Sequence, residues 1–372
     1  MLFKEIIGQE LVKQNLIQTV NAERISHAQL FHGKLGYGSF GLALAYTQYI
    51  FCTNKTSQDS CGGCASCLKI SQLSHPDVHF SFPVQLEAKK KTSDDFVSEW
   101  REMIQKSAYS SEQDWYHKTG NENKKGLIGV DESKRIAEKI SLKSYEGGYK
   151  VSLFWLAENM NAAAANKLLK LIEEPPEKTL IFLCAESIES ILPTILSRTQ
   201  LIKVSPLNDA QISQGLTEIL GADNQRATEI ASYVNGDFSL ATNELEMGEE
   251  KSFYFDSFVS WMRLCFKKDV AGAVKFVAEV QKMGKEKQKA FLLFVLSVFQ
   301  KSLMGNFVGM QNVKATEEQK KFIQNFMPYI HERNIGHLHE IMSEAYYHID
   351  RNANAKILFL DLSFDLFKLI KK

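Results

Sequence analysis

The sequence has little of three things: net charge, long apolar runs and repeats. Lysine and arginine total 44, and so do aspartate and glutamate, so the formal net charge is zero. A free-standing nucleic-acid-binding protein usually carries a basic excess, so any contact with DNA is expected to be local or made within an assembly. The longest apolar run, 291–299, is shorter than the roughly 20 residues that span a bilayer. No signal-peptide pattern opens the chain, and we expect a cytoplasmic protein with no membrane contact.

Cysteine is scarce outside one short segment. Four of the six cysteines lie between residues 52 and 67, namely Cys52, Cys61, Cys64 and Cys67. In a reducing cytosol such crowding favours a metal over disulfides, and four thiolates can close a tetrahedral zinc site that has no open position for catalysis. An iron–sulfur cluster and four free thiols are the alternatives. Cys184 and Cys265 lie in apolar runs and are expected in the core.

Two kinds of pattern divide the chain near residue 205. Before it, apolar strand-like runs (29–32, 150–156, 179–184) alternate with helical patterns, which predicts a parallel sheet with helical crossovers. After residue 207 only helical patterns continue, with two short helices at 208–220 and 226–235 and longer ones from about residue 249. Residues 85–125 are polar, and we interpret them as an insertion or mobile excursion with a short helix near 94–106.

A glycine-rich turn lies between the first strand and the next helix, where a phosphate-binding loop would lie. Gly33 and Gly38 match the two glycines of G-x-x-x-x-G-K-[ST], but Ser39 replaces the lysine and Phe40 replaces the hydroxyl residue. The lysine neutralises the β- and γ-phosphates and the hydroxyl holds Mg²⁺. Serine lacks the charge and phenylalanine cannot bind a metal, so this loop is degenerate, or is merely a glycine-rich turn.

The second element that an ATPase of this architecture needs is also altered. An acidic pair that holds Mg²⁺ and polarises water is expected at the end of the strand at 150–156. Leu156 and Ala157 stand there instead, and Glu158 is displaced toward the following helix. The loss of both elements indicates a fold derived from an ATPase that has given up hydrolysis.

The order of these features resembles the bacterial clamp-loader subunits of the AAA+ superfamily. The resemblance covers residues 1–205 well and the remainder in layout only. It rests on Phe3–Gln9, Arg24–Gly33, the cysteine cluster followed by His75-Pro76-Asp77, Ala165–Pro176 and Thr194–Arg198. It implies an α/β RecA-like AAA+ domain (1–205, with a zinc module at about 52–67 and the polar insertion at 85–125), an all-α lid (206–245) and an all-α collar domain for oligomerisation (246–372).

Within that family, intact phosphate loops mark the tau/gamma motor subunits. A degenerate loop beside a zinc module and a Ser-Arg motif implies the non-hydrolysing stator subunit of the DNA polymerase III clamp loader. No intrinsic ATPase is then expected, nucleotide binding is doubtful, and polymerase activity would belong to the holoenzyme. The implied partners are tau/gamma and delta in a hetero-pentamer, with the sliding clamp and primed DNA reached through the complex.

The resemblance also assigns roles to single residues. Arg198 would reach ATP held by a neighbouring motor subunit as an arginine finger in trans, where a guanidinium neutralises transition-state charge, and Ser197 would position it. Ser239 stands where the lid of the family usually carries a nucleotide-sensing arginine. Glu173 and Glu174, at a helix end before two prolines, are interpreted as solvated. Four histidines are interpreted as structural or surface residues: His27, His32, His75 and His79.

Two other functions remain open. The first is an active AAA+ ATPase with an atypical nucleotide site that uses Lys34 and Glu158. The second is a zinc-dependent DNA-binding module, which predicts tight and salt-dependent binding of DNA by the isolated chain. Zero net charge and the lack of a dense basic stripe count against this second alternative.

Overall fold

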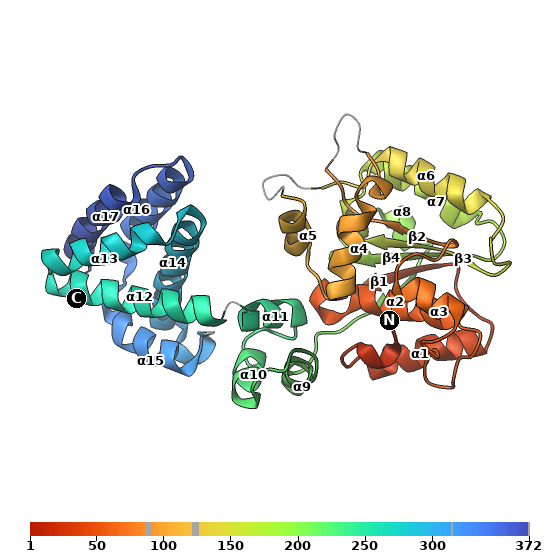
Figure 1. Cartoon of the computed structure of the whole chain (residues 1–372), viewed down its shortest axis with the longest axis horizontal. Helices are drawn as coiled ribbons and strands as arrows, with labels where there is room; N and C mark the ends of the chain where they lie inside the picture. Colours follow the sequence, from red (N-terminus) through yellow and green to blue (C-terminus); the bar gives the residue numbers. More distant parts are fainter. Residues whose placement is uncertain (86–90, 121–125, 247, 314, 371–372) are drawn as a thin grey trace. The chain divides into compact units, whose positions relative to one another are not determined.

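The computed structural model of the chain describes residues 1–85, 91–120, 126–246, 248–313 and 315–370 (Figure 1). The chain forms two compact units, Met1–Asn243 and Glu244–Lys372. The first unit contains a sheet covered by helices, and the second is helical. This confirms the predicted fold class, an α/β part followed by all-α parts, whereas the predicted lid and collar boundaries stay predictions.

Five parallel strands form the sheet of the first unit, in the order β2-β3-β4-β1-β5. The strands are β1 (Ala28–His32), β2 (Val78–Ser81), β3 (Lys150–Trp155), β4 (Thr179–Ala185) and β5 (Gln200–Lys203). Every residue of β3 and β4 is buried, as expected for parallel strands covered on both faces. Sequence patterns predicted β1, β3 and β4 but not the two edge strands.

Alternate residues of the three central strands, β1, β3 and β4, enter two different cores. In β4, Leu180, Phe182 and Cys184 pack in one core with residues of α2 (Ser39–Phe51). Ile181, Leu183 and Ala185 pack in the other core, with residues of α6 (Val130–Ser141) and α7 (Ala162–Glu173). The sheet therefore lies between two helical layers, and α6 and α7 are seen together on one side of it in Figure 1.

The remaining elements of the first unit complete these layers and continue beyond the sheet. The α-helices are α1 (Glu10–Asn21), α3 (Ala65–Ser71), α4 (Val97–Lys106), α5 (Glu112–Lys118), α8 (Pro193–Leu196), α9 (Asp209–Leu220), α10 (Asn224–Ala231) and α11 (Phe238–Glu246). Short 3-10 turns lie at Phe3–Glu5, Leu35–Tyr37, Ser93–Phe96 and Ala157–Asn159.

Within the segment 85–125, which was interpreted as an insertion or a mobile excursion, the described residues 91–120 pack as helices, and α4 corresponds to the short helix expected near 94–106. The polar residues of this segment surround two buried tryptophans, Trp100 of α4 and Trp115 of α5. The Trp100 ring stacks on Phe82 with 4.7 Å between centroids, and the Trp115 indole donates a 2.7 Å hydrogen bond to the Pro83 carbonyl. Residues 91–120 thus belong to the core of the first unit, while 86–90 and 121–125 lie outside the described residues. The two aromatic anchors outweigh the polar composition of the segment.

Three helices, α9, α10 and α11, follow β5, where two were expected. The second, α10, ends at Ala231, four residues before the predicted end. The chain then turns through Asn235 and Gly236, which both have positive φ. A Cβ at Gly236 would lie 2.4 Å from the Leu207 carbonyl oxygen, so this turn requires glycine and leads the chain into α11.

The second unit is built from helices around its own core. Its helices are α12 (Gly248–Lys267), α13 (Val270–Lys282), α14 (Lys285–Val308), α15 (Glu317–Phe326), α16 (Glu332–Asp350) and α17 (Ala355–Leu369), with 3-10 turns at Met310–Asn312 and Met327–Tyr329. Residues 287–308 of α14 are long and apolar enough to cross a membrane by length and composition, contrary to the expectation from the sequence. Phe291, Val295 and Phe299 of this helix are fully buried in the core of the unit, so part of its apolar composition is that of a core helix.

Candidate functional site

The degenerate phosphate loop joins the carboxyl end of β1 to α2, at the edge of the sheet where parallel α/β folds bind ligands. Gly33 allows a close approach, because a Cβ there would lie 2.4 Å from the Val204 carbonyl oxygen, and Gly38 has a φ of +91°. The strand–turn–helix geometry of a phosphate loop is therefore present. The question is which groups fill it.

The side chains at the two altered positions are turned into the protein. Ser39 and Phe40 are both fully buried. The Ser39 hydroxyl lies 3.4 Å from the Lys34 carbonyl oxygen, which accepts its hydrogen bond. The Phe40 ring packs edge-on against Trp100, with 5.6 Å between centroids. Neither residue offers the cation or the metal-binding hydroxyl that nucleotide hydrolysis needs.

A carboxylate of the protein accepts the amide hydrogen bond of this loop. Glu186 follows β4 directly, and its Oε1 accepts a 2.8 Å hydrogen bond from the Leu35 backbone N–H. The Glu186 N–H in turn donates to Oε1 of Glu158 at 2.8 Å. Burial raises the pKa of Glu158 to about 7, and burial together with the nearby Asp237 raises the pKa of Glu186. An anionic side chain thus binds a loop amide of the kind that binds phosphate oxygens in working loops.

A third acidic residue, Asp237, contacts the loop from the segment before α11. Asp237 precedes α11, and its Oδ1 accepts a hydrogen bond from the Leu240 N–H at 3.2 Å. Its Oδ2 lies 3.9 Å from the Lys34 ammonium. A Cβ added at Gly36 would lie 1.7 Å from Asp237 Oδ1. The segment before α11 is therefore in direct contact with the phosphate loop.

Neither Glu186 nor Asp237 was predicted from the sequence as a residue of this site. A signal for Glu186 was available, because it lies two residues after the apolar run 179–184, whose carboxyl end lies at the same edge of the sheet as the loop. Asp237 occupies the segment where only Ser239 was noted. Glu158, which the sequence placed next to the expected acidic pair, does lie at this site. Its Oε1 accepts a hydrogen bond from the Glu186 backbone N–H. Its Oε2 is buried and has no hydrogen-bond partner among the described residues.

The Ser-Arg motif lies at the end of the short helix α8. Arg198 is partly exposed, and its guanidinium has contacts on two sides. Nε lies 2.8 Å from Oε1 of Glu173, at the end of α7, and Nη1 donates to the Thr194 carbonyl oxygen at 3.1 Å and the Ser197 hydroxyl at 3.2 Å. Ser197 thus contacts Arg198, and its role in positioning the arginine stays a prediction. Glu173 is exposed, as expected for a solvated acid, and is also paired with Arg198.

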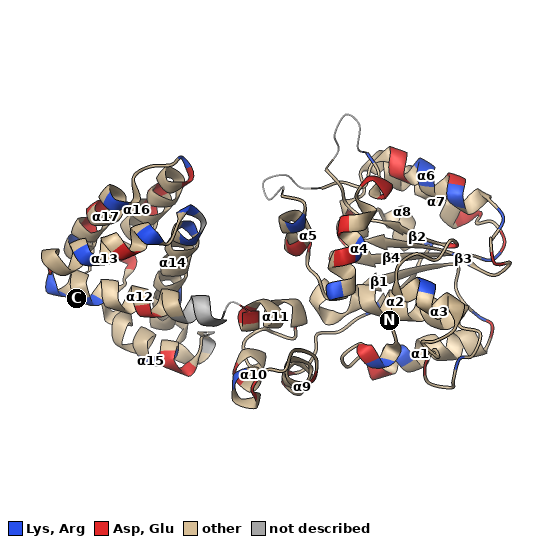
Figure 2. Ribbon diagram, viewed as in Figure 1, with Lys and Arg blue, Asp and Glu red and all other residues tan. Residues whose placement is uncertain are grey.

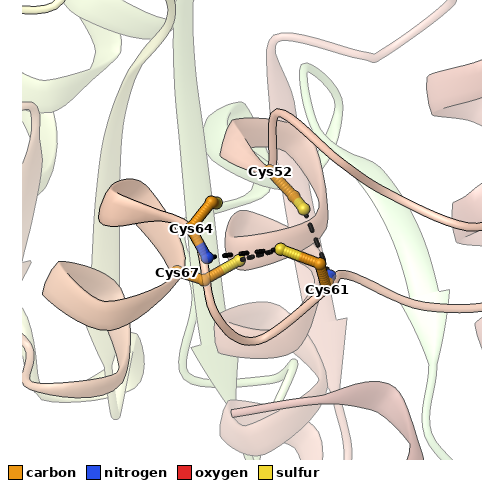
Figure 3. Close-up of side chains that lie close together, drawn as sticks. All are labelled: Cys52, Cys61, Cys64 and Cys67. Carbon is orange, nitrogen blue, oxygen red and sulfur yellow. Dashed lines mark hydrogen bonds between the residues drawn. The ribbon is translucent and has the colours of Figure 1, made fainter.

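The four clustered cysteines come together in space. Their sulfur atoms all lie within 4.8 Å of one another (Figure 3). Backbone N–H groups donate to two of them, from Cys61 to Cys52 Sγ at 3.2 Å and from Cys64 to Cys61 Sγ at 3.3 Å. Four thiolates around a zinc ion at about 2.3 Å would be about 3.8 Å apart, close to the 4.0 Å between the sulfurs of Cys61 and Cys67. This set could hold one metal ion.

Side chains outside the cluster tie this module to the rest of the unit. Glu146 pairs with Lys69 of α3 at 2.5 Å and accepts from Ser66 at 3.2 Å. It also lies 3.1 Å from Nε2 of the buried His75. The hydrogen bond from Lys69 and the nearby His75 lower the pKa of Glu146. His75 therefore serves the structure, in agreement with its interpretation from the sequence.

Charge is spread evenly over both units. Figure 2 shows Lys and Arg segments interspersed with Asp and Glu segments along the helices. Many of these charges are paired within one helix, as in Lys134 with Asp131 and Lys320 with Glu317. Acidic and basic residues occur together on most helices in the part of the chain that the structure describes, with α14 and its lysines as an exception.

Comparison with known proteins follows the same features. The sequence model of a family described as "DNA polymerase III, delta subunit" matches residues 8–208, just over half of the 372 residues. DNA polymerase III subunit delta' of Escherichia coli (strain K12) is 28% identical over 165 residues, which are 44% of this chain and 38% of that protein. The delta' subunit of Haemophilus influenzae is 28% identical over 222 residues, 59% of this chain and 56% of that protein.

A third relative is of a different type. DNA polymerase III subunit tau/gamma of Haemophilus influenzae is 32% identical over 95 residues, 26% of this chain and 14% of that protein. The aligned segments thus span only part of each relative, 38% and 56% of the two delta' subunits. Since the family match extends over more than half of the chain, the chain belongs to the delta-prime-like clamp-loader family of DNA polymerase III.

Proposed function

We propose that this chain is a non-hydrolysing delta-prime subunit, the stator of a bacterial clamp loader. In this role it supports ATP-dependent loading of the sliding clamp onto primed DNA. It binds tau/gamma and delta subunits in a hetero-pentamer in the cytoplasm, and it supplies Arg198 in trans to the nucleotide site of a neighbouring tau/gamma subunit. The observation that carries the proposal is the phosphate loop, which keeps its backbone shape but is filled by the chain's own side chains.

Three features of that loop support the lack of hydrolysis. The lysine and hydroxyl positions hold two buried residues, Ser39 and Phe40. The Leu35 amide already donates to a carboxylate. Acidic side chains around the loop would also repel the phosphates of a nucleotide, since like charges at short range disfavour binding. A nucleotide would have to displace these carboxylates and also bind without the usual cation.

The four cysteines are proposed as a structural zinc site. Tetrahedral thiolate sites of this kind leave no coordination position for substrate. The chain's own residues would hold the ion through Cys52, Cys61, Cys64 and Cys67, and the Glu146 contacts would keep α3 in place beside it. When bound, zinc would tie the segment 52–67 together and take no part in ATP chemistry.

The two alternative functions receive less support. An ATPase that uses Lys34 and Glu158 would need both groups free for nucleotide and Mg²⁺. Lys34 instead lies beside Asp237, and Glu158 accepts from the Glu186 amide with a pKa raised by burial to about 7. A zinc-dependent DNA-binding module would need a basic surface, whereas the charges are balanced and interspersed.

The deciding experiment is ATP turnover by a loader reconstituted with its cognate tau/gamma and delta subunits, clamp and primed DNA. We expect no turnover by the chain alone and robust turnover by the complex. Arg198→Ala should lower clamp-dependent turnover at least about tenfold, because arginine fingers contribute roughly 10³–10⁵ at the site they complete. Arg226→Ala is the matched control, since Arg226 also pairs with a glutamate, Glu229, at 3.1 Å.

Each outcome bears on a different part of the proposal. Turnover by the chain alone would contradict the account of the phosphate loop. Full activity of the Arg198→Ala complex would reject the proposed role of Arg198 in trans and would retain only the proposed role of the chain as a stator. Equal losses for the Arg198 and Arg226 variants would indicate a general effect of surface charge, and the finger would be rejected.

A further inference from the structure

We infer that Glu173 is a positioning residue that holds the Arg198 guanidinium ready for a phosphate group of a neighbouring subunit. This inference rests on the proposed role of Arg198 in trans and adds a second residue to it. The observation behind it is the contact between the two side chains, 2.8 Å from Arg198 Nε to Glu173 Oε1, where the sequence indicated a solvated acid.

The two residues are presented from a rigid base. Glu173 is the last residue of α7, and Arg198 follows α8 by two residues. Their neighbours Ile172 and Ile195 are each 1% exposed and share one hydrophobic core. Because packed helices move little relative to each other, the backbone positions from which the two side chains extend are fixed.

The remaining contacts of the guanidinium settle its orientation. Nη1 has two hydrogens, and it donates to the Thr194 carbonyl oxygen and to the Ser197 hydroxyl. The Glu173 carboxylate lies 2.8 Å from Nε in an ion pair. The Nη2 amino group makes no hydrogen bond to any residue that the structure describes. The side chain is thus held at Nη1 and Nε, and Nη2, which shares an edge with Nε, is the amino group left to bind a phosphate. An arginine held in this way does not have to be ordered when a phosphate arrives.

The local position of Glu173 also favours a specific role over a solvated surface acid. The carboxyl end of a helix carries a partial negative charge, so an acid in the last turn is locally disfavoured. Pro175 and Pro176 end the helix close to this point. A cation that bridges from α8 offsets the repulsion, and the pair is supported by two further hydrogen bonds to Arg198, unlike an isolated surface ion pair.

Glu173 could act on Arg198 in two opposite ways, and they predict opposite changes. As a positioning group it would raise turnover by fixing the geometry. As a neutralising group it would lower turnover by reducing the positive charge that faces the phosphate. We infer the first, because the nearest approach of the carboxylate is to Nε, while Nη2 keeps its donors for a phosphate.

The test uses the reconstituted loader, with kcat and KM for ATP measured separately. Glu173→Ala should lower kcat roughly threefold to tenfold, because small losses of alignment at a reacting group are costly, and should leave KM nearly unchanged. Glu173→Gln keeps an acceptor oxygen and should restore most of the loss. Glu174→Ala removes the adjacent exposed acid and should behave as wild type. Thermal unfolding of each variant checks that the fold is retained.

The results separate this inference from the proposed function. Glu173→Ala combined with Arg198→Ala should be no worse than Arg198→Ala alone, because Glu173 acts through Arg198. If Arg198→Ala has no effect, the proposed role in trans fails. If Arg198→Ala lowers turnover while Glu173→Ala equals wild type, or if Glu173→Ala and Glu173→Gln both raise turnover, the positioning role is overturned and the role in trans stands.

Discussion

At the scale of single residues, this site and a working nucleotide site differ in the charges that face the phosphate loop. A working loop offers a lysine and backbone amides to phosphates. Here the only lysine at the described loop, Lys34, lies beside Asp237, and the Leu35 amide donates to Glu186. Ser39 and Phe40 stand where a working loop has its catalytic groups. Glu186 and Asp237 then make the contacts with the Leu35 amide and Lys34 that the phosphates of a nucleotide would make.

Glu158 provides a test of this acidic environment. Burial raises its pKa to about 7 in the folded chain, against about 4.3 in an unfolded one. The folded state therefore binds the proton more tightly, and stability is lost as pH rises from about 4.3 to 7. We expect Glu158→Gln to be more stable than wild type at pH 8, on the order of 1–3 kcal/mol because Glu158 is only partly buried, and to gain nothing at pH 4.

Urea unfolding of both proteins from pH 4 to 8 measures this difference. Glu174→Gln serves as the control, because Glu174 is exposed and should change stability little at any pH. A constant difference between Glu158→Gln and wild type across the whole range would show that Glu158 does not titrate near neutral pH in the folded state.

At the scale of elements, the sequence predicted those that are long and uniformly apolar. The strands β3 and β4 are buried along their whole length, so a continuous apolar run identified them. The strand β5 lies at the sheet edge, and three of its four residues are exposed, so no apolar pattern marked it. The short helix expected near 94–106 corresponds to α4, whereas α5 was not predicted because it is anchored by one tryptophan among polar residues.

The candidate site divides in the same way. Local motifs identified the cysteine cluster, the altered phosphate loop and Arg198, because each is contained in a short stretch of sequence. Glu186 and Asp237 contact the loop from distant parts of the chain. The sequence places Glu186 at the same edge of the sheet as the loop, but its contact with Leu35 follows from the pairing of β1 with β4. The contact of Asp237 follows from the turn at Gly236, and neither feature can be read from local spacing.

A substitution at Gly36 tests the contact between the phosphate loop and the start of α11. A methyl group there would meet Asp237 Oδ1 at 1.7 Å, so Gly36→Ala must displace the carboxylate and the start of α11. We expect a loss of roughly 1–3 kcal/mol in the free energy of unfolding. Asp237→Ala also loses a helix-capping hydrogen bond to Leu240, typically about 1 kcal/mol.

The double variant decides whether the two positions touch. Once Asp237 is shortened, the added methyl group has room, so Gly36→Ala should cost much less in the Asp237→Ala background than in wild type. Gly63→Ala is a matched control for the glycine change, because a Cβ there meets nothing within 4 Å. Strict additivity of the two changes would contradict the close contact between loop and helix.

At the scale of the whole molecule, the chain joins two units that each have a core. The sheet unit buries its strands between two helical layers, and the second unit buries residues from α12 to α17 in a separate core. The family match covers residues 8–208 and so lies in the first unit. The cysteine cluster lies there as well. A metal ion should therefore stabilise one unit and leave the other unchanged.

Calorimetry of the full chain tests this division, and we expect two unfolding transitions. A strong chelator should lower the midpoint of one transition by several degrees, since a structural metal contributes to folding free energy only where its ligands lie. Cys64→Ser should show the lowered midpoint without chelator and should not respond to it further. The other transition should stay in place in every case, because the described residues of the second unit contain no group that could hold the ion.

If both transitions shifted together, the two units would not unfold independently. If neither shifted, the four cysteines would hold no stabilising metal, and the close approach of their sulfurs would reflect packing of thiols alone.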